Sequence, residues 1–539
     1  MYTPPVQDML FTLHDVLGFT HDDLDRETTE AVLDEAAKLA RDVLAPINKS
    51  GDEQGAVLKD GAVKTAEGFK EAYAAYRDGG WNAVPFDPAY EGQGLPWAVA
   101  FAVQEMWQGA NMSFGLCPLL NQGAIEAILA HGSDAQKDQY LPKMISGEWT
   151  GTMNLTESQA GSDLGEIRSK AEPQDDGSYK VSGQKIYITY GDHDMADNII
   201  HLVLARCVGA PDGVKGISLF IVPKILEDGA RNAASPIGLE HKLGIHASPT
   251  CTMEFDGAIG YLVGEENMGL KYMFTMMNNA RLSVGLQGVA IAERSYQQAL
   301  SYANDRVQGK SLKTGEKTVI ADHADVRRML LDMQARIWAG RLMAYDAALN
   351  LDKAHIGDAS ARAKVDVFTP IVKSWCTDMS VEVASLGVQI HGGMGFVEET
   401  GAAQYYRDAR ILPIYEGTNG IQSADLVFRK LLRDGGAGVN AVLDEFDGIL
   451  DQSYIDGLRS MTDTLLKAGA DKGYDRAAWL STPYLKAFGY CVGAVYLSKA
   501  AHVNGDYKCA DGVTVKELSE FYNSNILPYA TVFTAMFDG

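Results

Sequence analysis

The residue best suited to acid–base chemistry is Glu416, which lies in a short stretch without helical pattern. Pro413 and Gly417 bracket this carboxylate, and Ile414 and Tyr415 precede it directly. Apolar neighbours withdraw a carboxylate from water, which raises its pKa towards the range that suits a general base. The segment therefore predicts a proton acceptor at Glu416, and the alternative is an ordinary surface glutamate in a loop.

Thr418 follows this carboxylate and marks a helix start. Helical patterning resumes at Ser423, so Thr418 is a suitable N-cap residue. The first N–H groups of a helix have no partner within it and can bind the oxygens of an anion such as a diphosphate. Glu416 is thus expected to lie beside an anion site.

Two further segments could bind a flat, phosphorylated ligand. The first, Met153-Asn-Leu-Thr-Glu-Ser-Gln-Ala-Gly-Ser-Asp163, combines hydroxyls, a glycine and backbone donors that can bind phosphate oxygens or a flavin edge. In the second, Lys185-Ile-Tyr-Ile-Thr189, Tyr187 and Thr189 would point to one face of a strand, offering a ring system a wall and a hydrogen bond. The alternatives are an ordinary Ser/Asp-rich turn and an ordinary cross-strand pair.

A glycine cluster forms the fourth segment, Gln389-Ile-His-Gly-Gly-Met-Gly-Phe396. Three glycines in four positions permit positive φ angles and a close approach to a ligand. The spacing is not that of a dinucleotide-binding fingerprint, and a flexible helix end is the alternative. We interpret His391 within the cluster as structural.

The elements that must position these segments change type along the chain. Helical character runs from about Met112 to Met144 and closes with Gly147, whereas Thr250–Phe255 alternates polar and apolar residues as a half-buried strand does. Val326, Leu330, Met333 and Ile337 then mark one apolar helix face, and Gly435–Gly438 forms a break. The sequence predicts an α+β protein in four parts: an N-terminal α-helical domain (1–150), a middle β domain (151–267), an α-helical bundle carrying Glu416 (268–434) and a C-terminal helical extension (435–539).

Composition excludes several classes of function. Of 539 residues, 47 are Lys or Arg and 71 are Asp or Glu, giving a net charge of −24 that argues against binding to nucleic acid or anionic membranes. None of the six cysteines forms a CxxC pair, so neither a disulfide scaffold nor a thiolate zinc site is expected. The N-terminus lacks the features of a signal peptide, and no apolar run could span a membrane. We expect a soluble, cytoplasmic protein without a metal.

Taken together, the four segments resemble the acyl-CoA dehydrogenase family in order and separation. The quoted pieces LPKMISGEWTGTMNLTESQAGSD, SGQKIYIT, QIHGGMGF and YRDARILPIYEGTNGIQ carry the resemblance, which extends over roughly residues 30–430. The opening YTPPVQDMLF and the stretch FDGAIGYLVG are similar to larger bacterial members of the family and mark a subgroup. The resemblance to that subgroup implies a short-chain acyl-CoA or 3-methylmercaptopropionyl-CoA as the expected substrate.

The resemblance implies the family's fold and an FAD cofactor held between the β domain and the helical bundle. It implies flavin contacts in the middle domain at Met153, Leu155, Thr156, Gly161, Ser162, Tyr187, Ile188 and Thr189. It implies contacts with the FAD of a neighbouring subunit at Arg306, Gln389, Gly392 and Gly393, and cofactor contacts beside the base at Gly417 and Thr418. Ser162, Asn278 and Arg281 stand where the family contacts acyl-CoA. The chain departs from the family at Ser158, Tyr187 and Gly309, where proline, tryptophan and phenylalanine are usual.

The resemblance also implies a reaction. Glu416 would remove the α-proton of a thioester while flavin accepts the β-hydride, giving a trans-2-enoyl-CoA, and electron-transferring flavoprotein would reoxidise the flavin. The Glu416 backbone N–H and a ribityl hydroxyl would hold the thioester oxygen. The alternatives are an acyl-CoA oxidase, which uses oxygen, and a non-catalytic binding protein of the same fold. A nitroalkane oxidase is disfavoured because it would carry aspartate at position 416.

The chain continues well beyond Glu416, to residue 539. In larger relatives, similar C-terminal helical extensions cover surface that would otherwise form a tetramer. We therefore expect a homodimer, and the alternative is that the extension only stabilises the fold.

Overall fold

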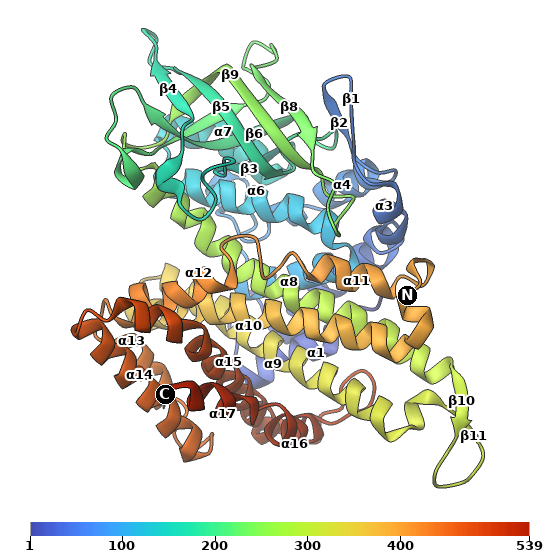
Figure 1. The fold of residues 1–539 in the computed structure, drawn as a ribbon. Helices are drawn as coiled ribbons and strands as arrows, with labels where there is room; N and C mark the ends of the chain where they lie inside the picture. The colour runs from blue at the N-terminus through green and yellow to red at the C-terminus, as the bar shows by residue number, and fades with distance from the viewer. Residues whose placement is uncertain (1, 538–539) are drawn as a thin grey trace. The chain divides into compact units, whose positions relative to one another are not determined.

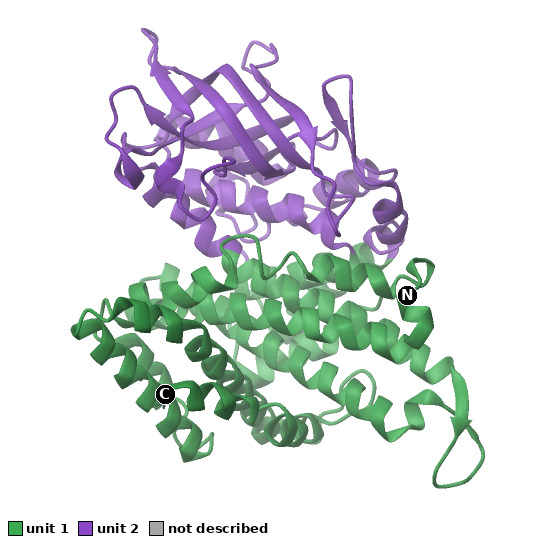
Figure 2. Cartoon of the chain, viewed as in Figure 1, with its two compact units in different colours: residues 1–41, 96–110, 281–539 green, residues 42–95, 111–280 purple. Residues whose placement is uncertain are grey.

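A computed structural model describes residues 2–537, which form two compact units (Figure 2). Unit 1 comprises the described residues up to 41, residues 96–110 and those from 281 onward. Unit 2 comprises residues 42–95 and 111–280. Each unit has its own interior, and the helix α8 (Gly269–Asp305) contributes to both.

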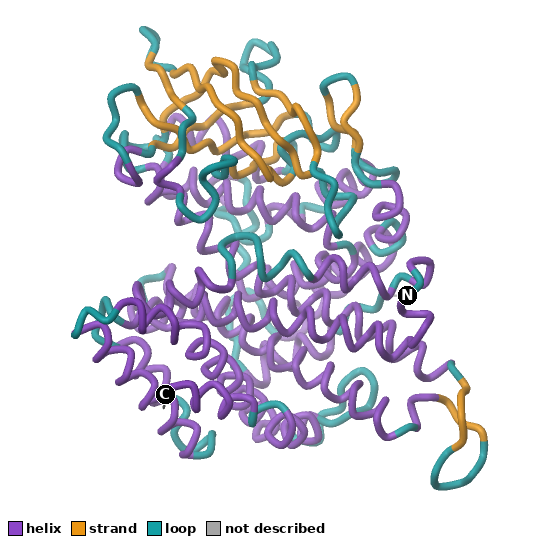
Figure 3. The backbone as a smooth tube through the Cα atoms, in the orientation of Figure 1, coloured by secondary structure: helices purple, strands orange, loops and turns teal. Residues whose placement is uncertain are grey.

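Unit 2 contains a seven-stranded sheet, whose strands are arrows in Figure 1 and orange in Figure 3. Its strands are β3 (Trp149–Asn154), β4 (Lys170–Pro173), β5 (Tyr179–Thr189), β6 (Asn198–Cys207), β7 (Ser218–Pro223), β8 (Ala234–Leu239) and β9 (Thr250–Leu262). The strands β6, β4, β5, β9 and β7 pair in turn, and β7 also pairs with β6, so the sheet forms a closed ring. Nine of the ten residues of β6 are buried, so both faces of this strand are covered.

Helices and one small hairpin complete unit 2. These elements are α3 (Asn48–Gln54), β1 (Val57–Lys59), β2 (Ala62–Lys64), α4 (Phe69–Asp78), α6 (Met112–His131) and α7 (Asp134–Ser146). The expected helical segment from Met112 to Met144 is two helices, because Ser133 begins α7 with a capping box that includes Gln136. Gly147, with a φ of 84°, ends α7 as expected.

Unit 1 is helical apart from one hairpin, as Figure 3 shows. Its first elements are α1 (Val6–Leu10), α2 (Arg26–Leu39), α5 (Trp97–Ala110), β10 (Val307–Lys310), β11 (Lys317–Val319), α9 (Ala324–His355), α10 (Ala359–His391), α11 (Ala402–Ala409) and α12 (Asn419–Ala424). After residue 434 follow α13 (Ala437–Asp444), α14 (Gln452–Ala470), α15 (Tyr474–Asn504), α16 (Val515–Asn525) and α17 (Tyr529–Thr534). A capping box between Thr514 and Glu517 begins α16, which confirms the prediction for that segment.

The C-terminal helices pack directly against the long helices α9 and α10. Gly489 on α15 permits this close approach, because a Cβ atom there would lie 2.4 Å from Cδ1 of Trp375 on α10. Phe368 on α10 and Tyr496 on α15 make an edge-to-face contact with ring centroids 6.2 Å apart. The helices after residue 434 thereby cover apolar surface of α9 and α10.

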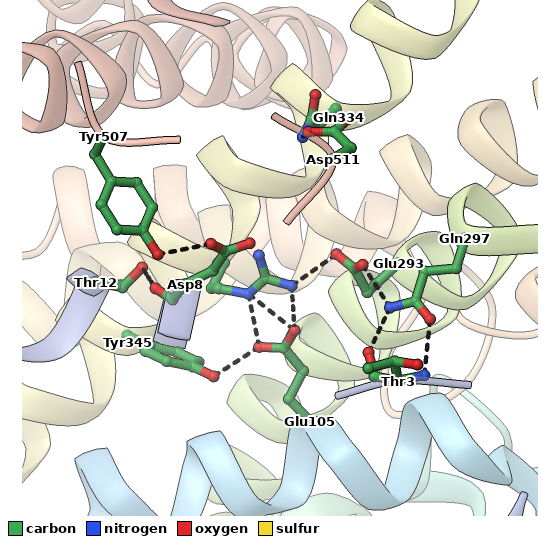
Figure 4. Close-up of polar contacts among 11 residues, drawn as sticks. Thr3, Asp8, Thr12, Glu105, Glu293, Gln297, Gln334, Tyr345, Tyr507 and Asp511 are labelled. Carbon is green, nitrogen blue, oxygen red and sulfur yellow. Dashed lines mark hydrogen bonds and ion pairs between the residues drawn. The ribbon is translucent and has the colours of Figure 1, made fainter. Parts of the chain in front are cut away.

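A buried group of charged and polar side chains joins α5, α8 and α9 within unit 1 (Figure 4). Arg341 on α9 is fully buried and donates to Glu105 on α5 at 2.6 Å and to Glu293 on α8 at 2.9 Å. The Tyr345 hydroxyl donates to Glu105 at 2.7 Å. Tyr2 is also fully buried, and a Cβ atom on Gly109 would lie 2.5 Å from its hydroxyl.

The observed elements confirm the predicted α+β architecture, in which helices are followed by a β region, a helical bundle and further helices. The four domain boundaries stay a prediction. All six cysteines are buried and free. Among the described residues, no helix is both long and apolar enough to cross a membrane.

Candidate active site

The backbone around Glu416 forms a strained turn between α11 and α12. Glu416 has a φ of 54° and Gly417 a φ of 83°, so two consecutive residues are left-handed. That conformation costs a residue other than glycine about 1–2 kcal/mol. It persists where surrounding contacts determine it, which is common at active sites. The sequence predicted the loop but not its left-handed backbone.

Hydrogen bonds fix both ends of this turn. Asn419 N–H donates to the Pro413 carbonyl at 3.0 Å, and the Thr418 hydroxyl accepts from Ile421 N–H at 3.3 Å. Thr418 is therefore the N-cap of α12, as predicted. The buried Gln422 side chain donates to the carbonyls of Glu416 and Gly417 at 3.3 and 3.2 Å.

Tyr415 anchors the loop on the side of α8. Its hydroxyl donates to Oε1 of the buried Gln287, whose amide in turn donates to Gln108 Oε1 at 3.1 Å. Burial, followed by the charge of Glu416, raises the pKa of Tyr415 well above its ordinary value. This hydroxyl is therefore a stable hydrogen-bond donor rather than a second acid.

Two cations from neighbouring helices act on the Glu416 carboxylate. Burial raises the pKa of Glu416, in agreement with the prediction, and the charges of Arg281 on α8 and Lys373 on α10 oppose that rise. A Cβ atom on Gly417 would lie 3.7 Å from Nη2 of Arg281, so the guanidinium lies against the turn. Arg281 itself is 3.7 Å from the Asp425 carboxylate.

Small residues bring these two helices together. A Cβ atom on Gly288 of α8 would lie 2.4 Å from the Cys376 carbonyl of α10, and one on Gly285 would lie 2.9 Å from the Val372 carbonyl. The backbones of α8 and α10 therefore approach each other closely in the region that contains Arg281 on α8 and Lys373 on α10. Lys373 was not predicted as a site residue.

In unit 2, the structure brings together the ends of β3 and β5. Ile186 N–H donates to the Thr156 carbonyl at 2.9 Å, and the Thr152 hydroxyl donates to the Thr189 carbonyl at 2.7 Å. The predicted contacts on these two segments therefore lie side by side: Met153, Leu155 and Thr156 on one, and Tyr187, Ile188 and Thr189 on the other. Tyr187 has a φ of 60° and lies where the register between β5 and β9 shifts, so the strand is not regular at this point.

Glu157 holds the polar turn of unit 2 against β5. Its carboxylate accepts from Lys185 Nζ at 2.8 Å, from the Ser169 hydroxyl at 2.6 Å and from Arg168 N–H at 2.8 Å. Burial acts to raise the pKa of Glu157, but Lys185 and these donors lower it to about 2. Gly161 and Ser162 lie exposed on the same turn.

The remaining predicted residues form a separate exposed group in unit 1, apart from Asn278, which is exposed on the unit 2 portion of α8. Tyr302 near the end of α8 stacks on His391 at the end of α10, with ring centroids 4.5 Å apart. The Nδ1–H group of His391 donates to the Gly387 carbonyl at 2.7 Å, and the ring is buried, which is consistent with a structural role. The stack places two helix ends side by side, and these ends carry Arg306, Gln389, Gly392 and Gly393.

Three family models match the chain. The acyl-CoA dehydrogenase N-terminal domain matches residues 26–148, the middle domain residues 152–258 and the C-terminal domain residues 267–431. A 3-methylmercaptopropionyl-CoA dehydrogenase of Ruegeria pomeroyi is 52% identical over 453 residues, covering 81% of this chain and 77% of the relative.

More distant proteins extend the similarity over nearly the whole chain. A broad-specificity linear acyl-CoA dehydrogenase, FadE5, of Mycobacterium tuberculosis is 35% identical, covering 92% of this chain and 86% of the relative. The solved structure of an acyl-CoA dehydrogenase complexed with FAD from Bacillus anthracis has a TM-score of 0.76 at 22% identity, covering 96% of this chain and 89% of that one.

Proposed function

Because the chain belongs to the acyl-CoA dehydrogenase family, and is an FAD-dependent enzyme that dehydrogenates acyl-CoA thioesters, we propose that Glu416 is its catalytic base. The observation that carries this proposal is the environment of the carboxylate. Glu416 lies in a left-handed turn, its pKa is raised by burial, and two cations oppose that rise. A carboxylate of raised pKa is a better acceptor for a carbon-bound proton than an ordinary surface glutamate.

The described residues fit an FAD cofactor. At the adjoining ends of β3 and β5, Tyr187 presents an aromatic ring that is 61% exposed, and the half-buried Thr156 and Thr189 supply hydroxyls. A Cβ atom on Gly161 would meet open space, so a ligand could approach the backbone there. An exposed aromatic face with hydroxyls beside it suits a flat ring system with a polar edge. We propose that these residues, with Met153, Leu155, Ile188 and Ser162, hold the flavin.

When bound, FAD supplies the acceptor for the hydride that leaves the substrate's β-carbon. The protein's own step is the removal of the α-proton, which passes to the Glu416 carboxylate as the trans-2-enoyl-CoA forms. Among the described residues, the Glu416 N–H donates to no hydrogen-bond acceptor. We propose that this N–H binds the thioester oxygen, where negative charge develops as the proton leaves.

We propose that Asn278 and Arg281 bind the acyl-CoA. They lie three residues apart on α8, so they are neighbours along the helix surface. Gly417 and Thr418 would contact the cofactor beside the base, and Arg306, Gln389, Gly392 and Gly393 would reach the FAD of a second subunit. The exposure of this last group and the open space beside both glycines support that assignment.

Glu416→Gln tests the assignment of the base. The variant should retain bound FAD and its visible spectrum but should lose bleaching of the flavin by substrate under anaerobic conditions. Glu520→Gln, which changes an exposed glutamate on α16, is the matched control and should reduce normally. If Glu416→Gln is reduced at the rate of the unchanged enzyme, Glu416 is not the base.

We propose 3-methylmercaptopropionyl-CoA or a short-chain acyl-CoA as the substrate, and the 52% identity to the Ruegeria pomeroyi enzyme supports this choice. Anaerobic titration with a panel of acyl-CoAs measures it directly. We expect the fastest bleaching with 3-methylmercaptopropionyl-CoA or butyryl-CoA. A clear preference for long-chain thioesters would contradict the proposal.

We further propose electron-transferring flavoprotein as the electron acceptor and a cytoplasmic homodimer as the working form. The helices after residue 434 cover apolar surface of α9 and α10, which supports an assembly smaller than a tetramer. Light scattering should give twice the mass of one chain, and four times that mass would contradict the dimer. Rapid oxygen consumption without an added acceptor would instead favour an acyl-CoA oxidase.

A further inference from the structure

Lys373 is a buried cation whose hydrogen-bond acceptors carry no charge. It lies in the middle of α10, its side chain is fully buried, and Nζ donates to the Gly417 carbonyl and to Asn419 Oδ1, both at 2.9 Å. A buried ammonium group is costly unless an ionised partner and hydrogen bonds compensate for lost water. The bonds of Lys373 go instead to the residue after Glu416 and to the first residue of α12.

The same region of α10 also binds the amide nitrogen of the Asn419 side chain. The Asn419 amide donates to Asp378 Oδ1 at 2.7 Å and to the Ser374 carbonyl at 3.2 Å. Lys373 therefore belongs to a set of contacts that attach the start of α12 to α10. The Lys373 ammonium group also donates to the Gly417 carbonyl. A change in the left-handed turn at Gly417 would therefore break this hydrogen bond.

Charged groups from several elements act on Lys373. Burial lowers its pKa to about 7, the carboxylates of Glu416 and Asp378 oppose this change, and Arg281 on α8 adds to it. Lys486 on α15 lies 3.4 Å from Asp378 and so shares that carboxylate. Lys373 in turn lowers the pKa of Glu416, after Arg281. The lysine and the glutamate thus influence each other's protonation.

We propose that Lys373 is a positioning residue for the base: its ammonium group fixes the Glu416–Gly417 turn and supplies part of the positive potential that favours the ionised carboxylate. This inference rests on the proposed role of Glu416. The alternative is that Lys373 only joins α10 to α12. The two differ in what they predict for the titration of Glu416, because a purely structural contact would leave that titration unchanged.

Three substitutions of Lys373 separate its charge from its hydrogen bonds. Lys373→Met removes both, Lys373→Gln keeps an N–H donor without the charge, and Lys373→Arg keeps the charge. The matched control is Lys364→Met, also on α10, because Lys364 is largely buried and binds Glu445 and Asp346 instead of the turn. The rate of anaerobic flavin reduction is measured against pH for each FAD-loaded protein, together with the Tm.

We expect Lys373→Met to reduce the rate at least tenfold and to move the acidic limb of the profile upward by about one pH unit. Lys373→Gln should recover part of the rate but keep the shifted limb. Lys373→Arg should keep the limb in its original place, and Lys364→Met should change only the Tm. If Lys373→Met does not fold, the comparison of Lys373→Gln with Lys373→Arg still tests the effect of the charge.

A second readout does not depend on turnover. Infrared difference spectra follow the protonated-carboxyl band of Glu416 against pH, with Glu416→Gln as the baseline. We expect this band to persist to higher pH in Lys373→Gln than in the unchanged protein. The inference would be overturned if Glu416→Gln is inactive but neither the carboxyl band of Glu416 nor the acidic limb of the pH profile shifts in Lys373→Met and Lys373→Gln. An active Glu416→Gln would instead overturn the assignment of the base.

Discussion

Glu416 is surrounded by groups that act on its ionisation in opposite directions, and the balance should be visible in the enzyme's pH dependence. Burial raises its pKa above the ordinary 4.5, and Arg281 and Lys373 limit that rise. A base must be ionised, so the rate of flavin reduction should fall as the pH drops through this raised pKa. We expect the acidic limb above pH 4.5, measured by single-turnover reduction. A rate of flavin reduction that does not change with pH on the acidic side would show that another step or group limits the rate.

Single residues also show what sequence can and cannot predict about the site. The N-cap Thr418 and the place of Glu416 in a loop were predictable because proline, glycine and the helical pattern are local signals. Lys373 was not, because it lies 44 residues before Gly417 in an ordinary helical stretch and meets the loop only through the fold. The left-handed φ of Tyr187 was missed for a related reason, since it depends on the register of β5 against β9.

Among the elements, the turn before β4 depends on one ion pair. Glu157 binds the fully buried Lys185, and its pKa is lowered to about 2. Because the folded pKa lies below the unfolded value, this carboxylate contributes stability above pH 4.5 that is lost as the pH falls towards 2. Glu157→Gln leaves Lys185 without its charged partner, and we expect a loss of about 3–5 kcal/mol at pH 7, measured by chemical denaturation.

The control for this prediction is an exposed pair. Glu35→Gln on α2 breaks a contact with Lys38 in which both side chains are more than half exposed, so it should cost about 0–1 kcal/mol. The Glu157→Gln deficit should also shrink between pH 4.5 and 2, where the native carboxylate becomes protonated. Equal losses in the two variants would mean that the buried pair does not hold the turn.

The order of helical and β regions was predictable from residue patterns, whereas the boundaries between consecutive helices depend on capping residues. The β region was predictable from alternation in segments such as Thr250–Phe255, which lies in β9. The boundary between α6 and α7 was missed although Ser133 and Gln136 have capping-box spacing. The closure of the sheet through β6 and β7 could not be predicted, because strand pairing joins residues that are distant in sequence.

For the whole molecule, the buried group around Arg341 should set the stability of unit 1. Arg341→Met leaves the fully buried Glu105 and its neighbour Glu293 without their cation. Breaking a buried pair in this way costs about 3–5 kcal/mol, so we expect a clearly lower Tm at pH 7. Acidic pH should narrow the difference, because protonation removes the unpaired charges.

Arg328→Met on the same helix is the comparison, since the ion pair of Arg328 with Asp325, at 2.9 Å, is exposed. Its Tm should stay close to that of the unchanged protein. If Arg341→Met lowers the Tm by the same amount at every pH, lost packing rather than unpaired charge explains the loss of stability.

The enclosure of Tyr2 has a practical consequence for anyone producing this enzyme. Its side chain has no exposed surface, and Gln297 binds the next residue, Thr3, at both its N–H (3.0 Å) and its carbonyl (2.8 Å). An affinity tag joined close to Tyr2 is therefore expected to disturb these contacts. Met536, near the other end, is 51% exposed, and a tag placed there should leave the purified enzyme undisturbed.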